Sequence, residues 1–147
     1  MVRAVCDYHQ TLDPNRFGFR PDVIARYATW LPQRASDSNS VLLLAQAGEA
    51  AAGFLVGEVL DEIPIYRIKQ YGFIHDLWVE PQFRRNGLGR ALIAESVRRF
   101  AAMGVQQVRG DTAEANPPAR AMFSQLGFVT STRQVLLSIG TTAAAKF

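Results

Sequence analysis

The fold of this chain is decided by the segment FIHDLWVEPQFRRNGLGRALIA, residues 73–94. It predicts a strand over 73–79, a short loop at Glu80 and Pro81, and then a basic, glycine-containing turn over 84–89 that leads directly into a helix. Glycines at the start of a helix leave the first backbone N–H groups uncovered, and the helix dipole adds partial positive charge there. The segment therefore predicts a site that binds a diphosphate.

The residues expected to hold the diphosphate lie in the turn and the first turn of the helix. They are Arg84, Arg85, Asn86, Gly87, Leu88, Gly89 and Arg90. Two alternatives remain: a plain connection with surface arginines, and a dinucleotide-binding turn with Asp111 as its acid. Leu92 disfavours the dinucleotide turn, because that motif needs a small residue at this position for close packing of helix and strand.

Two ordered motifs give the segment a family resemblance. Residues 84–89, RRNGLG, match the [QR]xxGx[GA] motif of the GNAT superfamily of N-acetyltransferases. Downstream, residues 116–128 resemble the second signature of that family, NxxAxxLYxxLGF. The resemblance covers roughly residues 41–138, the motif-bearing core, and it implies that the cradled diphosphate belongs to acetyl-coenzyme A.

The resemblance also implies a fold and further contacts with the coenzyme. The expected fold is the acyl-CoA N-acyltransferase fold, an α/β arrangement with a mixed, mostly antiparallel, twisted sheet flanked by helices. The main chain of Leu77, Trp78 and Val79 is expected to pair with the pantetheine arm, with Asn116 as a further contact. Phe123 is also expected to contact the coenzyme. It lies where the family often has a tyrosine that protonates the departing sulfur, and a phenylalanine has no hydroxyl for that step.

Composition limits the class of protein. The chain has 147 residues, a net charge of +3 and one cysteine, which predicts one domain over 1–147 in a reducing, cytoplasmic setting. The charge is too small to indicate nucleic acid, and no apolar run has the length of a membrane span. No metal site is expected.

Periodicity and punctuation predict the remaining elements. Two helices are expected near the N-terminus, over 2–12 and from Asp22 to Leu31 with Pro32 as the stop. A third follows Gly89, with Gly104 at its end and one face formed by Ile93, Val97, Phe100 and Ala101, and a fourth follows an Asn116 cap, with one face formed by Ala119, Met122, Phe123 and Leu126. Strands are expected over 41–47, 52–60 and 105–109, and a strand or hairpin over 128–139. The tail over 141–147 is expected to fray.

Three side chains are candidates for the group that takes the proton from an amine acceptor. His75 and Asp76 lie on the predicted strand 73–79, and Glu58 lies near the end of the preceding strand. Strand alternation places His75 on the face of Leu77 and Val79, with Asp76 on the opposite face. A histidine ionises near neutral pH, which suits proton transfer, but a purely structural role for His75 fits the sequence equally well.

Asp111, directly after a predicted strand, is a fourth and weaker candidate for this base. The sequence does not choose among the four.

The beginning of the chain differs from the family pattern. A strand normally precedes the first helix, whereas here position 1 falls where that helix is already under way. Because an uncovered sheet edge invites pairing with another chain, a homodimer or a C-terminal segment is expected to protect it.

These observations predict an N-acetyltransferase that moves the acetyl group of acetyl-CoA directly to a primary amine. The acceptor, a small molecule or a protein amine, is not identified by the sequence. The alternative is a non-catalytic coenzyme A-binding regulatory module, which the missing hydroxyl at Phe123 favours.

Overall fold

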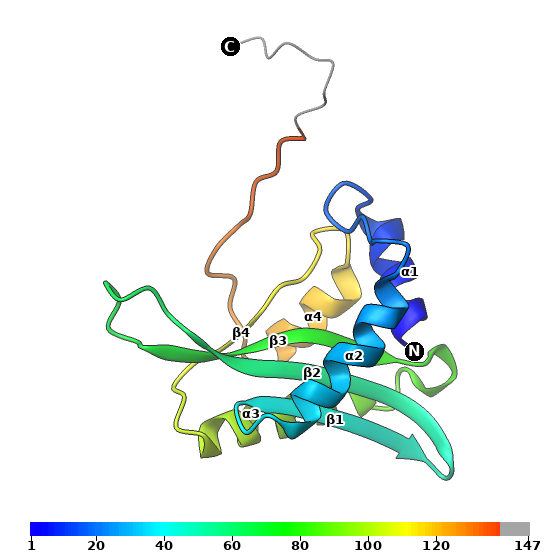
Figure 1. Ribbon diagram of the computed structural model, residues 1–147, viewed down its shortest axis with the longest axis horizontal. Coiled ribbons are helices and arrows are strands. Elements are labelled where there is room, and N and C mark those ends of the chain that lie inside the picture. Colours follow the sequence, from blue (N-terminus) through cyan, green and yellow to red (C-terminus); the bar gives the residue numbers. More distant parts are fainter. Residues whose placement is uncertain (139–147) are drawn as a thin grey trace.

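The computed structural model describes residues 1–138 of the chain (Figure 1). In chain order the elements are α1 (Val2–Leu12), α2 (Val23–Ser36), β1 (Ser40–Ala47), β2 (Ala50–Asp61), β3 (Gln70–Val79), the short 3₁₀ helix η1 (Pro81–Phe83), α3 (Leu88–Ala102), β4 (Val108–Gly110) and α4 (Pro117–Gln125). The predicted fold class is confirmed: a mixed, mostly antiparallel sheet is flanked by helices.

The strands lie in one sheet in the order β1-β2-β3-β4. β2 pairs antiparallel with both β1 and β3, whereas β4 runs parallel to β3. Parallel neighbours need a crossover connection, and α3 supplies it. The β3–β4 pairing begins at Gly72 opposite Val108 and ends at Ile74 opposite Gly110. β3 and β4 are therefore paired only near the start of β3, and within the described part of the chain the rest of β3 has no partner on this side.

Helices cover both faces of the sheet (Figure 1). Under α1 and α2 the buried cluster consists of Val5, Cys6, Phe54, Val56 and Trp78. On the opposite face, under α3, the buried cluster consists of Val41, Leu43, Leu55, Ile74, Leu92, Ile93 and Phe100, with residues of α4 packed at its edge. β2 contributes to both clusters, which explains why it reads as a nearly continuous apolar run.

Phe100 of α3 packs directly on two glycines of the sheet. Its side chain is fully buried. A Cβ atom at Gly57 would lie 2.9 Å from Cζ of this ring, and a Cβ atom at Gly72 would lie 2.6 Å from its Cγ. No side chain fits at Gly72 unless the ring moves, and at Gly57 the main-chain oxygen of Phe73, 2.6 Å from the added Cβ, would have to move as well. The two glycines thus allow α3 to approach the sheet where β3 and β4 begin to pair.

The helix predicted to stop at Pro32 continues to Ser36, so that prediction is wrong. A proline inside a helix removes one main-chain hydrogen bond. In the added turn Arg34 forms an ion pair with Glu58 of β2, and the Ser36 hydroxyl donates to the Pro32 carbonyl at 3.1 Å. These contacts hold the last turn in place despite the proline.

The predicted buried face of α3 is correct for Ile93 and Phe100 and wrong for Val97 and Ala101, which are exposed. The buried residues of this helix are Leu92, Ile93, Ser96 and Phe100. The helix is therefore rotated about its axis relative to the expectation, so that Leu92 and Ser96 face the sheet.

The C-terminal part of the chain differs most from the predictions. The strand expected over 105–109 is shorter and later, Val108–Gly110, because the chain first leaves α3 through Gly104 in a left-handed conformation. No strand forms over 128–138, where Val129 and Val135 are 85% and 93% exposed. Strand propensity alone does not form a strand without a paired neighbour. Residue 139 and the tail predicted to fray lie outside the described residues.

None of the helices over residues 1–138 has the length and apolar character needed to cross a membrane. The homodimer proposed to protect a sheet edge stays a prediction.

Candidate active site

β3 extends five residues, 75–79, beyond its last pair with β4. β2 pairs with the other edge of β3 over this range, as far as Gly53 opposite Val79. Over residues 1–138 no strand lies beside the free edge. Its backbone N–H and C=O groups need partners, and an extended ligand can supply them as an added strand does. This gap, called the wedge below, contains the main chain of Leu77, Trp78 and Val79.

A β-bulge occurs in β3 at His75, beside the wedge. Val56 of β2 pairs with Asp76, and Gly57 pairs with Ile74, which leaves His75 as an extra residue in β3. Because side chains alternate between faces along a strand, one extra residue reverses the alternation beyond it. The face assignment made from the sequence therefore fails after His75.

His75 and Asp76 both lie on the face covered by α2, so the prediction that they face opposite ways is wrong. The His75 ring packs edge-on against Trp30, with 5.8 Å between ring centroids. The carboxylate of Asp76 accepts a hydrogen bond from the Tyr27 hydroxyl at 2.9 Å. Leu77 packs against the opposite cluster under α3. The bulge thus brings two titratable side chains to one face.

The turn before α3 presents free backbone donors. Gly87 is the N-cap residue in a left-handed conformation with φ of 80°, and no side chain caps the helix. The first hydrogen bond of the helix runs from the Ala91 N–H to the Gly87 carbonyl at 3.0 Å, so the N–H groups of residues 88–90 have no partner within the helix. A Cβ atom at Gly89 would lie 3.1 Å from the sulfur of Met122. This arrangement suits an anion, as the sequence predicts.

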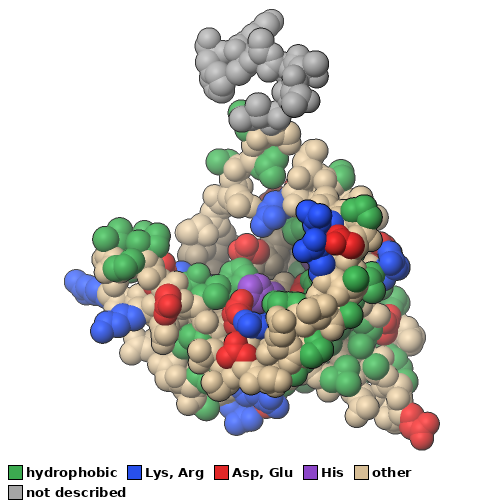
Figure 2. All heavy atoms as spheres, viewed as in Figure 1, with side chains coloured by type: hydrophobic (Ala, Val, Ile, Leu, Met, Phe, Trp, Pro, Cys, Tyr) green, Lys and Arg blue, Asp and Glu red, His purple; other side chains and the backbone are tan. Residues whose placement is uncertain are grey.

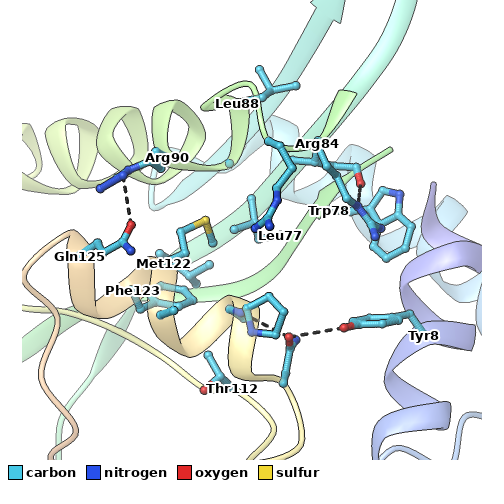
Figure 3. A pocket seen from close by; sticks show the side chains of 18 of the residues that line it. Tyr8, Leu77, Trp78, Arg84, Leu88, Arg90, Thr112, Met122, Phe123 and Gln125 are labelled. Atoms are coloured by element: carbon cyan, nitrogen blue, oxygen red, sulfur yellow. Dashed lines mark hydrogen bonds between the residues drawn. The ribbon is translucent and has the colours of Figure 1, made fainter. Parts of the chain in front are cut away.

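Arg84 connects this turn to the end of β3. Its Nε donates to the Val79 carbonyl at 2.8 Å, and its guanidinium lies over the Trp78 ring, 4.6 Å from the centroid (Figure 3). The Val79 carbonyl therefore already has a partner. Arg84 fixes the geometry of the turn as well as adding charge to it.

The other two arginines lie around the same turn. Arg85 has φ of 66°, a left-handed conformation that is uncommon outside glycine. Arg90 donates to the side chain of Gln125 in α4 at 3.1 Å. Both side chains are exposed, and they concentrate positive charge at the mouth of the wedge.

α4 and α1 enclose the wedge on its far side. Asn116 caps α4: its Oδ1 accepts from the Ala119 N–H at 3.3 Å, and Pro117 is the first helical residue. The hydroxyl of Tyr8 in α1 donates to the same Oδ1 at 3.4 Å. Tyr8 and Phe123 reach into the cleft from opposite sides (Figure 3). A contact between distant parts of the sequence thus spans the cleft.

His75 is paired with a carboxylate. Its Nε2 lies 2.7 Å from Oε1 of Glu58, and the other carboxylate oxygen of Glu58 forms an ion pair with Arg34. The side chains of His75 and Glu58 are 28% and 19% exposed, and Phe73 and Trp30 pack on the imidazole. Acidic side chains gather around a histidine in a hollow on this face (Figure 2). The arrangement can orient an imidazole for proton transfer.

Asp76 has a different environment. Burial raises the pKa of its carboxyl above the ordinary range, and the Tyr27 hydroxyl bond only partly opposes that rise. Burial and the neighbouring carboxylate in turn raise the pKa of Tyr27. The hydrogen bond between Tyr27 of α2 and Asp76 of β3 joins the helix to the sheet.

A cleft of about 730 Å³ unites most of the predicted site. The predicted residues that line it are His75, Leu77, Trp78, Val79, Arg84, Arg85, Gly87, Leu88, Gly89, Arg90, Asp111, Asn116 and Phe123. Glu58, Asp76 and Asn86 do not line it. Glu58 reaches the cleft through His75, whereas Asp76 has no such link.

Sequence reasoning missed Tyr8, His9, Phe83 and Thr112, which also line the cleft. Tyr8 reaches it because α1 packs on the sheet, where its ring lies edge-on to Trp78 with 5.9 Å between centroids. No motif in the sequence marks this contact, since it depends on how a distant helix packs.

A sheet opened between two parallel strands, with a glycine turn and a helix N-terminus at its mouth, defines a class of fold that suits an extended, phosphate-bearing ligand along a strand edge. The sequence profile of the acetyltransferase (GNAT) family matches residues 4–128. The chain belongs to that family.

Among curated proteins, the chain is similar to the [ribosomal protein bS18]-alanine N-acetyltransferase of Escherichia coli (strain K12). The two are 32% identical over 85 residues, which is 58% of this chain and 51% of the relative. The chain thus matches about half the length of this relative.

Two solved structures share the fold. The aminoglycoside antibiotic 6'-N-acetyltransferase AAC(6')-IG from Acinetobacter haemolyticus superposes with a TM-score of 0.69 at 23% identity, covering 85% of this chain and 87% of that one. The aminoglycoside N-acetyltransferase AAC(6')-Iy in complex with CoA superposes with a TM-score of 0.71 at 20% identity, covering 93% and 90%.

Proposed function

We propose that this chain is an acetyl-CoA-dependent N-acetyltransferase that moves the acetyl group directly to a primary amine, without a covalent enzyme intermediate. The observation that carries the proposal is the free edge of β3 over 75–79 beside the uncapped N-terminus of α3. A pantetheine arm is extended and carries amide groups, and a diphosphate lies at its end. The wedge and the turn match those two parts in order.

The coenzyme would be held by main-chain groups at both ends of the cleft. The N–H groups of residues 88–90 would bind the diphosphate, with Arg85 and Arg90 adding charge. Main-chain groups alternate between the two edges of a strand, and the Glu80 N–H donates to Ala52 of β2, so the groups of Trp78 point to β2 as well. The main chain of Leu77 would pair with the pantetheine, which brings the thioester toward Asn116. Positioning the thioester in this way supplies much of the catalysis in a direct transfer.

His75 would act as the general base, and Glu58 would position it. A lysine-like amine has a pKa of about 10.4, so it must lose a proton before it attacks. With the Nε2 hydrogen donated to Glu58, Nδ1 of His75 carries the lone pair that takes this proton. Asp76 is a poorer base because it accepts the Tyr27 hydroxyl and does not line the cleft.

The relatives provide the first acceptors to test. One is named for acetylation of a ribosomal-protein alanine and others for acetylation of aminoglycosides. A panel of a peptide with an N-terminal alanine, an aminoglycoside, a polyamine and a lysine derivative covers both kinds. Release of the free thiol from acetyl-CoA, followed colorimetrically with each amine, measures turnover.

Replacing His75 by glutamine tests the assignment of the base. We expect kcat to fall about 100-fold or more, while the affinity for acetyl-CoA, measured by calorimetry, stays the same. Glu58→Gln should have a smaller effect of the same kind. Glu95→Gln is the control, because that carboxylate pairs with Arg98 on the outer surface of α3. Unchanged turnover in His75→Gln would show that another group is the base.

The alternative function is a coenzyme A-binding regulatory module without transferase activity. The absence of a hydroxyl at Phe123 favours it. Tight binding of acetyl-CoA with no thiol release for any amine of the panel would support the module over the enzyme.

A further inference from the structure

The departing sulfur needs a partner in the cleft, and Phe123 cannot supply one. When an amine displaces coenzyme A, the carbon–sulfur bond breaks and the sulfur leaves as a thiolate. A hydrogen-bond donor beside the sulfur stabilises that charge as it develops. The side chain of Phe123 is a hydrocarbon that packs edge-on against Phe128, with 5.0 Å between ring centroids.

Tyr8 presents its hydroxyl across the same cleft. Among the described residues that line the cleft, it is the only tyrosine. Its ring is held edge-on to Trp78 of β3, and its hydroxyl reaches Oδ1 of Asn116 at the start of α4. Figure 3 shows the hydroxyl of Tyr8 and the ring of Phe123 approaching the cleft from opposite sides. The phenol thus lies between the wedge and α4, where the thioester would end.

The present partner of this hydroxyl leaves it available for another acceptor. The distance from the Tyr8 hydroxyl to Oδ1 of Asn116 is 3.4 Å, which is long for an O–H donor. That oxygen also accepts from the Ala119 N–H, so Asn116 keeps its capping bond when the phenol turns away. Tyr27 is no substitute, because its hydroxyl is held by Asp76 under α2.

We propose that the hydroxyl of Tyr8 donates to the departing sulfur and protonates it. This inference rests on the proposed function. The amine nitrogen bonds to the carbonyl carbon, the carbon–sulfur bond breaks, and its electron pair leaves on sulfur. The phenol proton passes to the sulfur, which gives free coenzyme A, and solvent returns a proton to the phenolate. The proton released by the amine passes to His75 and then to solvent.

The direct test is the pKa of the coenzyme A thiol bound to the protein, which needs no acceptor amine. A free thiol has a pKa of about 8.5, and its thiolate is followed by ultraviolet absorbance during a pH titration of the complex. A hydrogen bond from Tyr8 stabilises the thiolate, so the pKa should be lower in the wild-type complex than in Tyr8→Phe by about one unit.

Two further variants separate this role from a structural one. The double variant Tyr8→Phe with Phe123→Tyr should have a lower thiol pKa than Tyr8→Phe alone, because it returns a phenol to the cleft from α4. Tyr66→Phe, at the exposed end of the β2–β3 connection, should leave the pKa unchanged. With an amine that turns over, Tyr8→Phe should lower kcat while the affinity for acetyl-CoA is retained.

The outcomes are distinguishable. Equal thiol pKa values in wild type and Tyr8→Phe, with coenzyme A bound to both, would overturn the assignment of Tyr8 and leave the proposed function intact. Loss of coenzyme A binding in Tyr8→Phe would also overturn it, since the hydroxyl would then serve binding. If the wild-type chain does not bind coenzyme A, the proposed function fails and the role of Tyr8 fails with it.

Discussion

Replacing Gly72 by alanine tests how closely α3 packs on the sheet at the closed end of the wedge. Where the backbone accepts it, Gly→Ala stabilises a protein by about 0.4–1 kcal/mol, and Gly72 has no left-handed φ that would oppose the change. The added Cβ would, however, lie 2.6 Å from Cγ of Phe100 and 2.8 Å from each Cδ. An optimal carbon contact is about 3.5–4.0 Å. The ring would have to move by about 1 Å, and such overpacking costs about 1–3 kcal/mol.

The double variant with Phe100→Ala makes this reasoning quantitative. Phe100→Ala alone should cost about 3–5 kcal/mol, since the ring is fully buried. In the double variant the new methyl group enters the space that the ring has left, so the overpacking disappears. We expect its cost to be close to that of Phe100→Ala alone, about 1–3 kcal/mol less than the sum of the single costs.

Urea unfolding followed by circular dichroism gives the three free energies. Gly110→Ala is the matched control, because its Cβ would meet Ile74 at an ordinary 3.5 Å, and it should be neutral or stabilise the protein by up to about 1 kcal/mol. If the costs of Gly72→Ala and Phe100→Ala add to within about 0.5 kcal/mol, the ring does not rest on Gly72 as described.

Two other predictions concern the site. Gly89→Val should weaken acetyl-CoA binding by at least about tenfold, because its side chain meets Met122 and covers the helix N-terminus; calorimetry with Gly18→Ala as control checks this, and an unchanged Kd would argue against the cradle. Asp76 has a raised pKa in the folded state, so its contribution to stability is complete below its ordinary pKa and is lost as pH rises through the raised value. Asp76→Asn should therefore gain stability relative to wild type as pH rises above the ordinary carboxyl pKa of about 4 in urea unfolding, and a difference that does not vary with pH would contradict the burial of this carboxyl.

Local sequence signals predicted the elements well where they act through neighbouring residues. Asn116 and Pro117 form the predicted start of α4, and Gly104 ends α3 with a left-handed φ. The glycine turn leads into a helix N-terminus as expected. These features depend on caps and turns that a few adjacent residues determine, so the sequence alone is enough to place them.

The errors arise where distant residues decide the outcome. Pro32 does not end α2, because Arg34 in the next turn pairs with Glu58 of β2. The bulge at His75 depends on how β2 and β3 pair, and a strict alternation cannot reveal it. Tyr8 enters the cleft only through the packing of a helix that begins 73 residues before the free edge of β3, at Val2 against His75. Each case is a tertiary contact without a local signature.

The free edge of β3 has a consequence for the half-life of the protein in the cell. If a pantetheine arm fills the wedge, the coenzyme replaces a missing strand, and the folded state is stabilised by about 2.7 kcal/mol at a ligand concentration 100 times Kd. Since proteases and chaperones act on the open form, the half-life of the chain would then follow the supply of acetyl-CoA. A protein built around this gap would be retained when its substrate is plentiful and degraded when it is scarce.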